Sequence, residues 1–106
     1  MLVKMESPNG SGSTLKTKTE TISVAAGGMT VTLPSDLTKI VAVNVYLTNV
    51  GTSYSGTGFV DDDGTAYKTN MNQLNYPNYP IKTLTQTSLV LQYDNAQQMT
   101  YKLWYK

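Results

Sequence analysis

Three consecutive aspartates, Asp61, Asp62 and Asp63, followed by Gly64, form the one acidic cluster of the sequence. Calcium binds about six to eight oxygen ligands, and three carboxylates with nearby hydroxyls offer part of such a shell. Consecutive side chains cannot all point at one ion, however, and the terminal Glu of the EF-hand loop is absent. The cluster is therefore a weak calcium candidate. The sequence favours a solvated hairpin turn, in which Asp-Gly supplies the positive φ.

A second group of residues combines aromatic rings with side-chain amides in loop-like segments. Its members are Tyr54, Tyr76, Tyr79, Asn75 and Asn78. Such rings and amides can stack on sugars or pack against a partner protein. Alternatively, the Tyr-Pro pairs only stiffen a long loop at residues 70–80, because proline fixes φ. The sequence leaves both interpretations open.

The side chains that most often carry out catalysis are missing, because the chain contains no His, no Cys and no Arg. A carboxylate pair for glycoside hydrolysis or a Ser-Lys dyad remains formally open, but no Gly-x-Ser-x-Gly elbow and no phosphate loop is present. Eight Lys against seven acidic residues give a net charge of +1, which favours neither nucleic acid nor an anionic membrane. We predict a chain that is not an enzyme and needs no cofactor.

Residues 39–49 carry the strongest structural pattern in the sequence. Val41, Val43, Val45 and Leu47 form an apolar row at period two, which is typical of a β-strand with one buried face. β-Branched residues dominate the segment, and Gly and Pro are absent from it. We predict a central strand here, covered by the rest of the chain.

Other segments alternate in the same way. Residues 14–24 are polar on both faces and fit a sheet edge or a hydroxyl-lined contact between subunits, with the edge as the default. Residues 29–33 precede the central strand closely and are expected to pair with it, whereas 50–58 are expected to form a loop. A hairpin is predicted around 61–64, and further strands at 87–93 and 98–106. This spacing predicts an all-β antiparallel β-sandwich or jelly roll of about seven or eight strands.

The chain divides into a short N-terminal arm, residues 1–13, and a single domain, residues 14–106. Leu2, Val3 and Met5 are followed by a Ser- and Gly-rich linker, so the arm is either disordered, a first strand, or a segment that binds a neighbouring subunit. On the last strand, Trp104 alternates with Tyr101, Leu103 and other apolar residues. It is expected either to cover a second sheet or to bind a partner.

Residues 29–34, 40–48 and the turn at 95–99, with the terminal aromatic strand, resemble small β-domains of bacteriophage virion proteins. These are decoration, collar, fibre and tail-tip components, and the resemblance extends over about residues 20–106. It implies a non-enzymatic β-sandwich that assembles on the virion as a symmetric oligomer, with a trimer favoured. A chain this short has no fibre shaft, which favours an accessory subunit that binds a preassembled surface.

The expected function is therefore structural, as a capsid decoration or head and tail accessory subunit. The expected partners are other virion proteins and further copies of the chain, and the expected location is the virion, assembled in the host cytoplasm. Leu2, Val3, Met5 and Trp104 are the candidate contact residues. The alternative is a carbohydrate-binding adhesin or receptor-binding domain, in which Tyr54, Tyr76 and Tyr79 stack on the sugar.

Overall fold

The computed structural model describes residues 15–49, 51–69, 80–93 and 96–106. For residues 51–54 it describes the backbone but not the side chains. The described residues form eight strands and no helix, which confirms the all-β prediction. The strands are β1 (Lys16–Val24), β2 (Met29–Thr30), β3 (Ile40–Leu47), β4 (Gly51–Val60), β5 (Ala66–Thr69), β6 (Ile81–Leu84), β7 (Leu89–Leu91) and β8 (Gln97–Tyr105).

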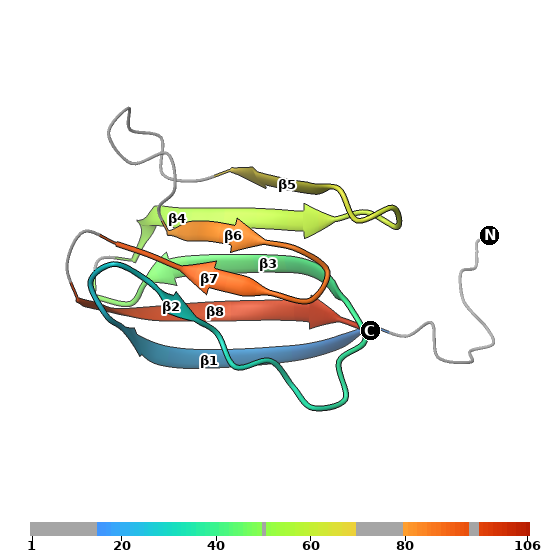
Figure 1. Cartoon of the computed structure of the whole chain (residues 1–106). Coiled ribbons are helices and arrows are strands. Elements are labelled where there is room, and N and C mark those ends of the chain that lie inside the picture. The colour runs from blue at the N-terminus through green and yellow to red at the C-terminus, as the bar shows by residue number, and fades with distance from the viewer. Residues whose placement is uncertain (1–14, 50, 70–79, 94–95) are drawn as a thin grey trace, which may run out of the picture.

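The strands form two antiparallel sheets (Figure 1). The large sheet has the order β1-β8-β3-β4-β5, and the small sheet has the order β2-β7-β6. The segment with the strongest apolar alternation, β3, is the middle strand of the large sheet, as predicted. The polar strand β1 lies at its edge, also as predicted.

One predicted pairing is wrong. β2 does not pair with β3 but with β7 in the small sheet, where Met29 is opposite Leu91. The backbone N–H of Val31 extends this contact by donating to the carbonyl of Leu89, at 2.8 Å. A short connection favours a hairpin only when both strands belong to one sheet, whereas residues 31–39 lead from the small sheet to the large one.

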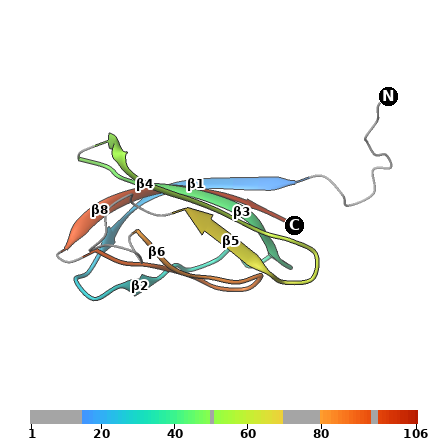
Figure 2. The same ribbon diagram turned by 90° about the horizontal axis from the view of Figure 1, so that it is seen from above.

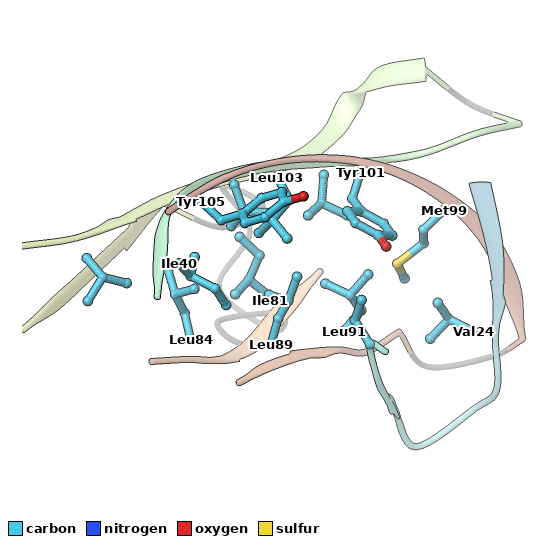
Figure 3. Close-up of a cluster of buried hydrophobic side chains, with 14 of the residues drawn as sticks. Val24, Ile40, Ile81, Leu84, Leu89, Leu91, Met99, Tyr101, Leu103 and Tyr105 are labelled. Carbon is cyan, nitrogen blue, oxygen red and sulfur yellow. The ribbon is translucent and has the colours of Figure 1, made fainter. Parts of the chain in front are cut away.

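The core lies between the two sheets, which Figure 2 shows as separate layers. The large sheet contributes alternate residues of β3 and β8, and the small sheet contributes most of its apolar side chains (Figure 3). The fully buried members include Val43, Val45, Met99, Tyr101, Leu103, Ile81, Leu89 and Leu91. On β8, the buried residues are Met99, Tyr101, Leu103 and Tyr105, the row that alternates with Trp104 in the sequence.

The inward row predicted for β3 is wrong at Val41. Ile40 is opposite Tyr105 and Ala42 is opposite Trp104, so that Val41 is an extra residue in a β-bulge. The bulge turns Ile40 into the core, where it is fully buried, and places Val41 by the outer face. A strict period of two cannot anticipate this shift, because an inserted residue exchanges the two faces of the strand.

The segment expected to be a loop, residues 50–58, contains most of β4. Gly58 has a packing role, because a Cβ built on it would lie 2.5 Å from Leu84 Cδ2 of the small sheet. Close approach of another layer is a common reason for glycine in a strand. Glycine lowers strand propensity, so this strand was not indicated by sequence. The sequence also did not indicate β6, whose residue Leu84 packs against Gly58 of β4.

Candidate functional site

The outer face of the large sheet, opposite the core, carries a line of apolar side chains that we call the aromatic row. Trp104 on β8 is opposite Ala42 on β3, Ala42 is opposite Phe59 on β4, and Phe59 is opposite Tyr67 on β5. The neighbours of these residues along each strand, such as Leu103 and Val60, are buried in the core. Strand alternation therefore directs the members of the row away from the core.

Phe59 and Tyr67 form the exposed end of the aromatic row. Their rings are stacked, with centroids 4.8 Å apart and an interplanar angle of 21°. Phe59 is 51% exposed and Tyr67 is 48% exposed, although both are large apolar residues. A stacked pair of this kind stabilises the hairpin and also leaves apolar area that a partner can cover.

The other end of the row borders an open pocket of about 390 Å³. Its lining is Leu15, Val41, Ala42, Val43, Asn44, Thr57 and Trp104. The bulge in β3 brings Val41 into the lining of the pocket. Leu15, which directly precedes β1 and is 42% exposed, borders it on the other side. The Nζ of Lys102 lies 5.1 Å from the centroid of the Trp104 ring, so a cation borders the indole.

A second line of residues, which we call the polar row, runs beside the aromatic row. It has one residue from each of the five strands of the large sheet: Thr19, Lys102, Asn44, Thr57 and Thr69. The Asn44 amide donates to the Thr57 hydroxyl at 3.0 Å, so the two central members hold each other in place. Together, the two rows offer apolar area beside hydroxyl, amide and ammonium groups. This combination is suited to binding.

The edge strand β1 is held to β8 by side chains as well as by its backbone. On the core-facing side, the Tyr101 hydroxyl donates to Glu20 Oε1 at 2.7 Å. This hydrogen bond is the main reason that the pKa of Glu20 is lowered, while burial is the main reason that the pKa of Tyr101 is raised. On the outer face, the Thr100 hydroxyl is 2.9 Å from that of Thr21 and 2.8 Å from that of Thr48.

The three aspartates of the calcium candidate lie in the β4–β5 turn and have other contacts. Asp61 Oδ1 accepts hydrogen bonds from the backbone N–H groups of Asp63 and Thr65, at 3.2 and 3.0 Å. Asp62 pairs with Lys39 at 3.0 Å, and the hydrogen bond from Lys39 is the main reason that its pKa is lowered. Gly64 has a φ of +92°, as the hairpin prediction requires. In the part of the chain that the structure describes, no three acidic side chains are grouped as a metal site.

Trp104 is the one predicted contact residue whose side chain the structure describes. It does not cover the small sheet, because the core side of β8 is formed by Leu103 and Tyr105 while Trp104 lines the outer pocket. The sequence left two alternatives for Trp104, and the one in which it covers a second sheet is therefore wrong. Leu2, Val3, Met5, Tyr76, Tyr79, Asn75 and Asn78 lie outside the described residues, and Tyr54 lies in β4 with its side chain outside them.

Sequence reasoning did not identify Phe59, Tyr67 and Leu15 as members of a surface. Phe59 and Tyr67 lie in the two strands of the β4–β5 hairpin, on either side of its turn. Two aromatic residues at equal distances from a turn are a signal for cross-strand stacking. No comparable signal marks Leu15 as a neighbour of Trp104. Their proximity depends on the register between β1 and β8, in which Thr17 is opposite Trp104.

Comparison with known proteins gives no match, since no family model, no curated protein and no solved structure is similar to this chain. No helix suited to crossing a membrane occurs within the described ranges.

Proposed function

We propose that this chain is a non-enzymatic structural protein of a virus particle, a capsid decoration or head and tail accessory subunit. It attaches through protein–protein contacts and assembles as a homo-oligomer. Its fold is a β-sandwich, a proposal supported by the two sheets that share one apolar core. The resemblance of residues 29–34, 40–48 and 95–99 to small phage virion domains supports the location.

The observation that carries the proposed mode of action is the exposed aromatic row. Phe59 and Tyr67 are about half exposed, and Ala42 separates them from Trp104 at the apolar pocket. Together these side chains form a surface that water solvates poorly. Trp and Tyr are the residues on which protein interfaces most often depend. The neighbouring polar row provides the hydrogen-bonding groups that occur at the rim of such interfaces.

The location is tested by mass spectrometry of density-purified particles of the virus that encodes the chain. We expect the chain in a fixed ratio to a capsid or tail protein, retained through repeated purification. A chain abundant in the infected cell but absent from the purified particles would contradict the proposal.

The contact surface is tested with particles that lack the chain, to which purified protein is added back. Trp104→Ala and Phe59→Ala should each weaken attachment by about tenfold or more, because each removes a large apolar contact. Thr30→Ala, at an exposed position of β2 in the small sheet, is the matched control and should attach nearly as the wild type does. Unchanged attachment by both aromatic variants would exclude the aromatic row as the contact surface.

A carbohydrate-binding role is the second candidate, and the Phe59–Tyr67 pair is the observation that favours it. Exposed rings beside the Asn44 amide and the Thr57 hydroxyl are a combination that sugar-binding surfaces use. A glycan array distinguishes the two roles. Saturable binding that is lost in Tyr67→Ala, or in Tyr76→Ala and Tyr79→Ala, would support the adhesin and contradict a purely structural function.

A further inference from the structure

The edge strand β1 offers a second surface, distinct from the aromatic row. It has nine residues and pairs with β8 on one side. Most of its side chains are exposed, and Val24 at its end is buried. The free edge of a strand presents backbone donors and acceptors to which another strand can add.

A two-fold axis through an antiparallel strand pair passes between a residue and its own copy. Five such registers are centred near the middle of β1, at Thr17, Lys18, Thr19, Glu20 and Thr21. Centring on Thr21 brings no charges together, because it places Glu20 opposite Ile22 and Lys18 opposite Val24. Centring on Lys18 or Glu20 places a charge opposite its own copy, and centring on Thr17 places Lys16 opposite Lys18. Like charges directly opposite each other destabilise a strand pair.

The register centred on Thr19 avoids these conflicts and adds attraction. It places Lys18 opposite Glu20 of the second copy, twice by symmetry, and Thr17 opposite Thr21. Opposite charges and Thr–Thr pairs are both favourable across neighbouring strands. Lys16 would then be opposite Ile22, but its charge already has a partner in its own chain, Asp36, at 3.0 Å.

We propose that β1 pairs with β1 of a second copy of this chain, antiparallel and centred on Thr19, so that two large sheets join into one of ten strands. Glu20 is prepared for this contact, because the Tyr101 hydroxyl fixes its carboxylate at the edge while 43% of the side chain remains exposed. Lys18 lies 3.5 Å from Glu20 in its own chain, so both partners of the intersubunit pair are on one face of the strand.

The proposed dimer also arranges the candidate binding surface. Thr17 of β1 is opposite Trp104, so the aromatic row of each copy begins at the level of its own Thr17. Since Thr17 would be opposite Thr21 of the second copy, the two rows are displaced by four residues, which is about 13 Å along the strands. Both rows face the same side, which would give the dimer two contacts with a repetitive surface.

The β1 pairing specifies the contact between copies of the chain and rests on the homo-oligomer of the proposed function. It can be tested in solution without any virus particle. A dimer formed by a chain absent from particles would overturn the virion role alone. A monomeric chain found in particles would overturn the β1 pairing and the homo-oligomer, but not the virion role.

Cysteine crosslinking tests the register directly, because the natural chain has no cysteine. Thr19→Cys should form a disulfide-linked dimer on mild oxidation, since a residue on the axis is about 4.5 to 5.5 Å from its copy. Thr17→Cys is the matched control. Its copy would be about 13 Å away, beyond the reach of a disulfide, so it should not crosslink with itself but should crosslink with added Thr21→Cys. Crosslinking at residue 17 but not at 19 would overturn the register.

Charge exchange tests the electrostatic pairing by light scattering and sedimentation of the full chain. The wild type should be a dimer, and Lys18→Glu and Glu20→Lys should each weaken dimerisation by about tenfold or more, because two like-charge pairs replace two opposite ones. Mixing the two variants should restore a dimer, since each chain then faces its complement. A trimer, a monomer at every concentration, or no recovery on mixing of folded variants would overturn the proposal.

Discussion

At the scale of single residues, Gly58 shows how closely the two sheets approach. A Cβ at this position would lie 2.5 Å from Leu84 Cδ2 and 3.2 Å from the Tyr67 carbonyl oxygen. Leu84 is buried, so its side chain has little room to move aside. The requirement at Gly58 is therefore steric: the space between β4 and β6 excludes even a methyl group.

We predict that Gly58→Ala lowers the free energy of unfolding by about 1–3 kcal/mol, as overpacked cores generally do. Urea unfolding followed by circular dichroism measures this. A second substitution, Leu84→Ala, removes the clashing group, so the double variant should lose less stability than the sum of the two single variants. Strict additivity would mean that Leu84 is not the cause.

The buried hydroxyl of Tyr101 gives the second prediction at this scale. Because the pKa of Glu20 is lower in the folded chain than its ordinary 4.5, the stability that Glu20 contributes is present above that pH. It is lost as the pH falls through the folded value. Tyr101→Phe removes the hydrogen bond that is the main cause of the lowered pKa, and should cost about 1 kcal/mol at pH 7 and less at pH 3.

Tyr105→Phe is the matched control, measured by urea unfolding at both pH values. Its hydroxyl lies 3.4 Å from Asp36, and the pKa of Asp36 is lowered mainly by Lys16 rather than by Tyr105. The control should therefore alter the acid dependence less than Tyr101→Phe does. An equal penalty for Tyr101→Phe at pH 3 and pH 7 would contradict the role assigned to Glu20.

At the scale of elements, the stability of the β4–β5 hairpin depends more on Asp61 than on Asp62. Asp61 accepts two backbone hydrogen bonds within the turn, whereas Asp62 forms an exposed ion pair with Lys39. We predict that Asp61→Ala destabilises the fold by about 1 kcal/mol and that Asp62→Ala has little effect, because exposed ion pairs contribute little. Thermal unfolding compares the two variants. The reverse order would show that the turn is not held by Asp61.

The same hairpin connects the two sheets. Lys68 on β5 donates from its Nζ to the carbonyl oxygens of Ile81 and Lys82, at 3.2 and 2.7 Å, so its side chain crosses to β6. Burial lowers the pKa of this ammonium group. The side of the fold at β5 and β6 is thus closed by Lys68 and by the contact of Gly58 with Leu84. At the opposite side, β1 pairs only with β8 among the described strands.

At the scale of the whole molecule, the described strands and their core lie within residues 16–105. We therefore predict that a chain lacking residues 1–13 keeps its circular dichroism spectrum and its urea midpoint. The same truncated chain should fail to attach to its virus particle if the arm carries Leu2, Val3 and Met5 to a neighbouring subunit. Attachment by the truncated chain at wild-type strength would show that the arm has no role in docking.

The sequence by itself determined the strand type, the central position of β3 and the division of β8 into two faces. These follow from alternation of apolar and polar residues, which is a local property that backbone geometry converts directly into two faces. The turn at residues 61–64 was equally evident, because hairpin turns need a residue with positive φ and glycine adopts it readily. Gly64 has this conformation.

The tertiary structure decided what depends on residues distant in sequence. The bulge at Val41, the strand made of small residues around Gly58 and the pairing of β2 with β7 each depend on a neighbour more than ten positions away. The aromatic row has the same origin, since Trp104, Phe59 and Tyr67 meet only through the registers of four strands. A pattern along one strand fixes which face a side chain occupies. Which side chains share that face is fixed by pairing between strands.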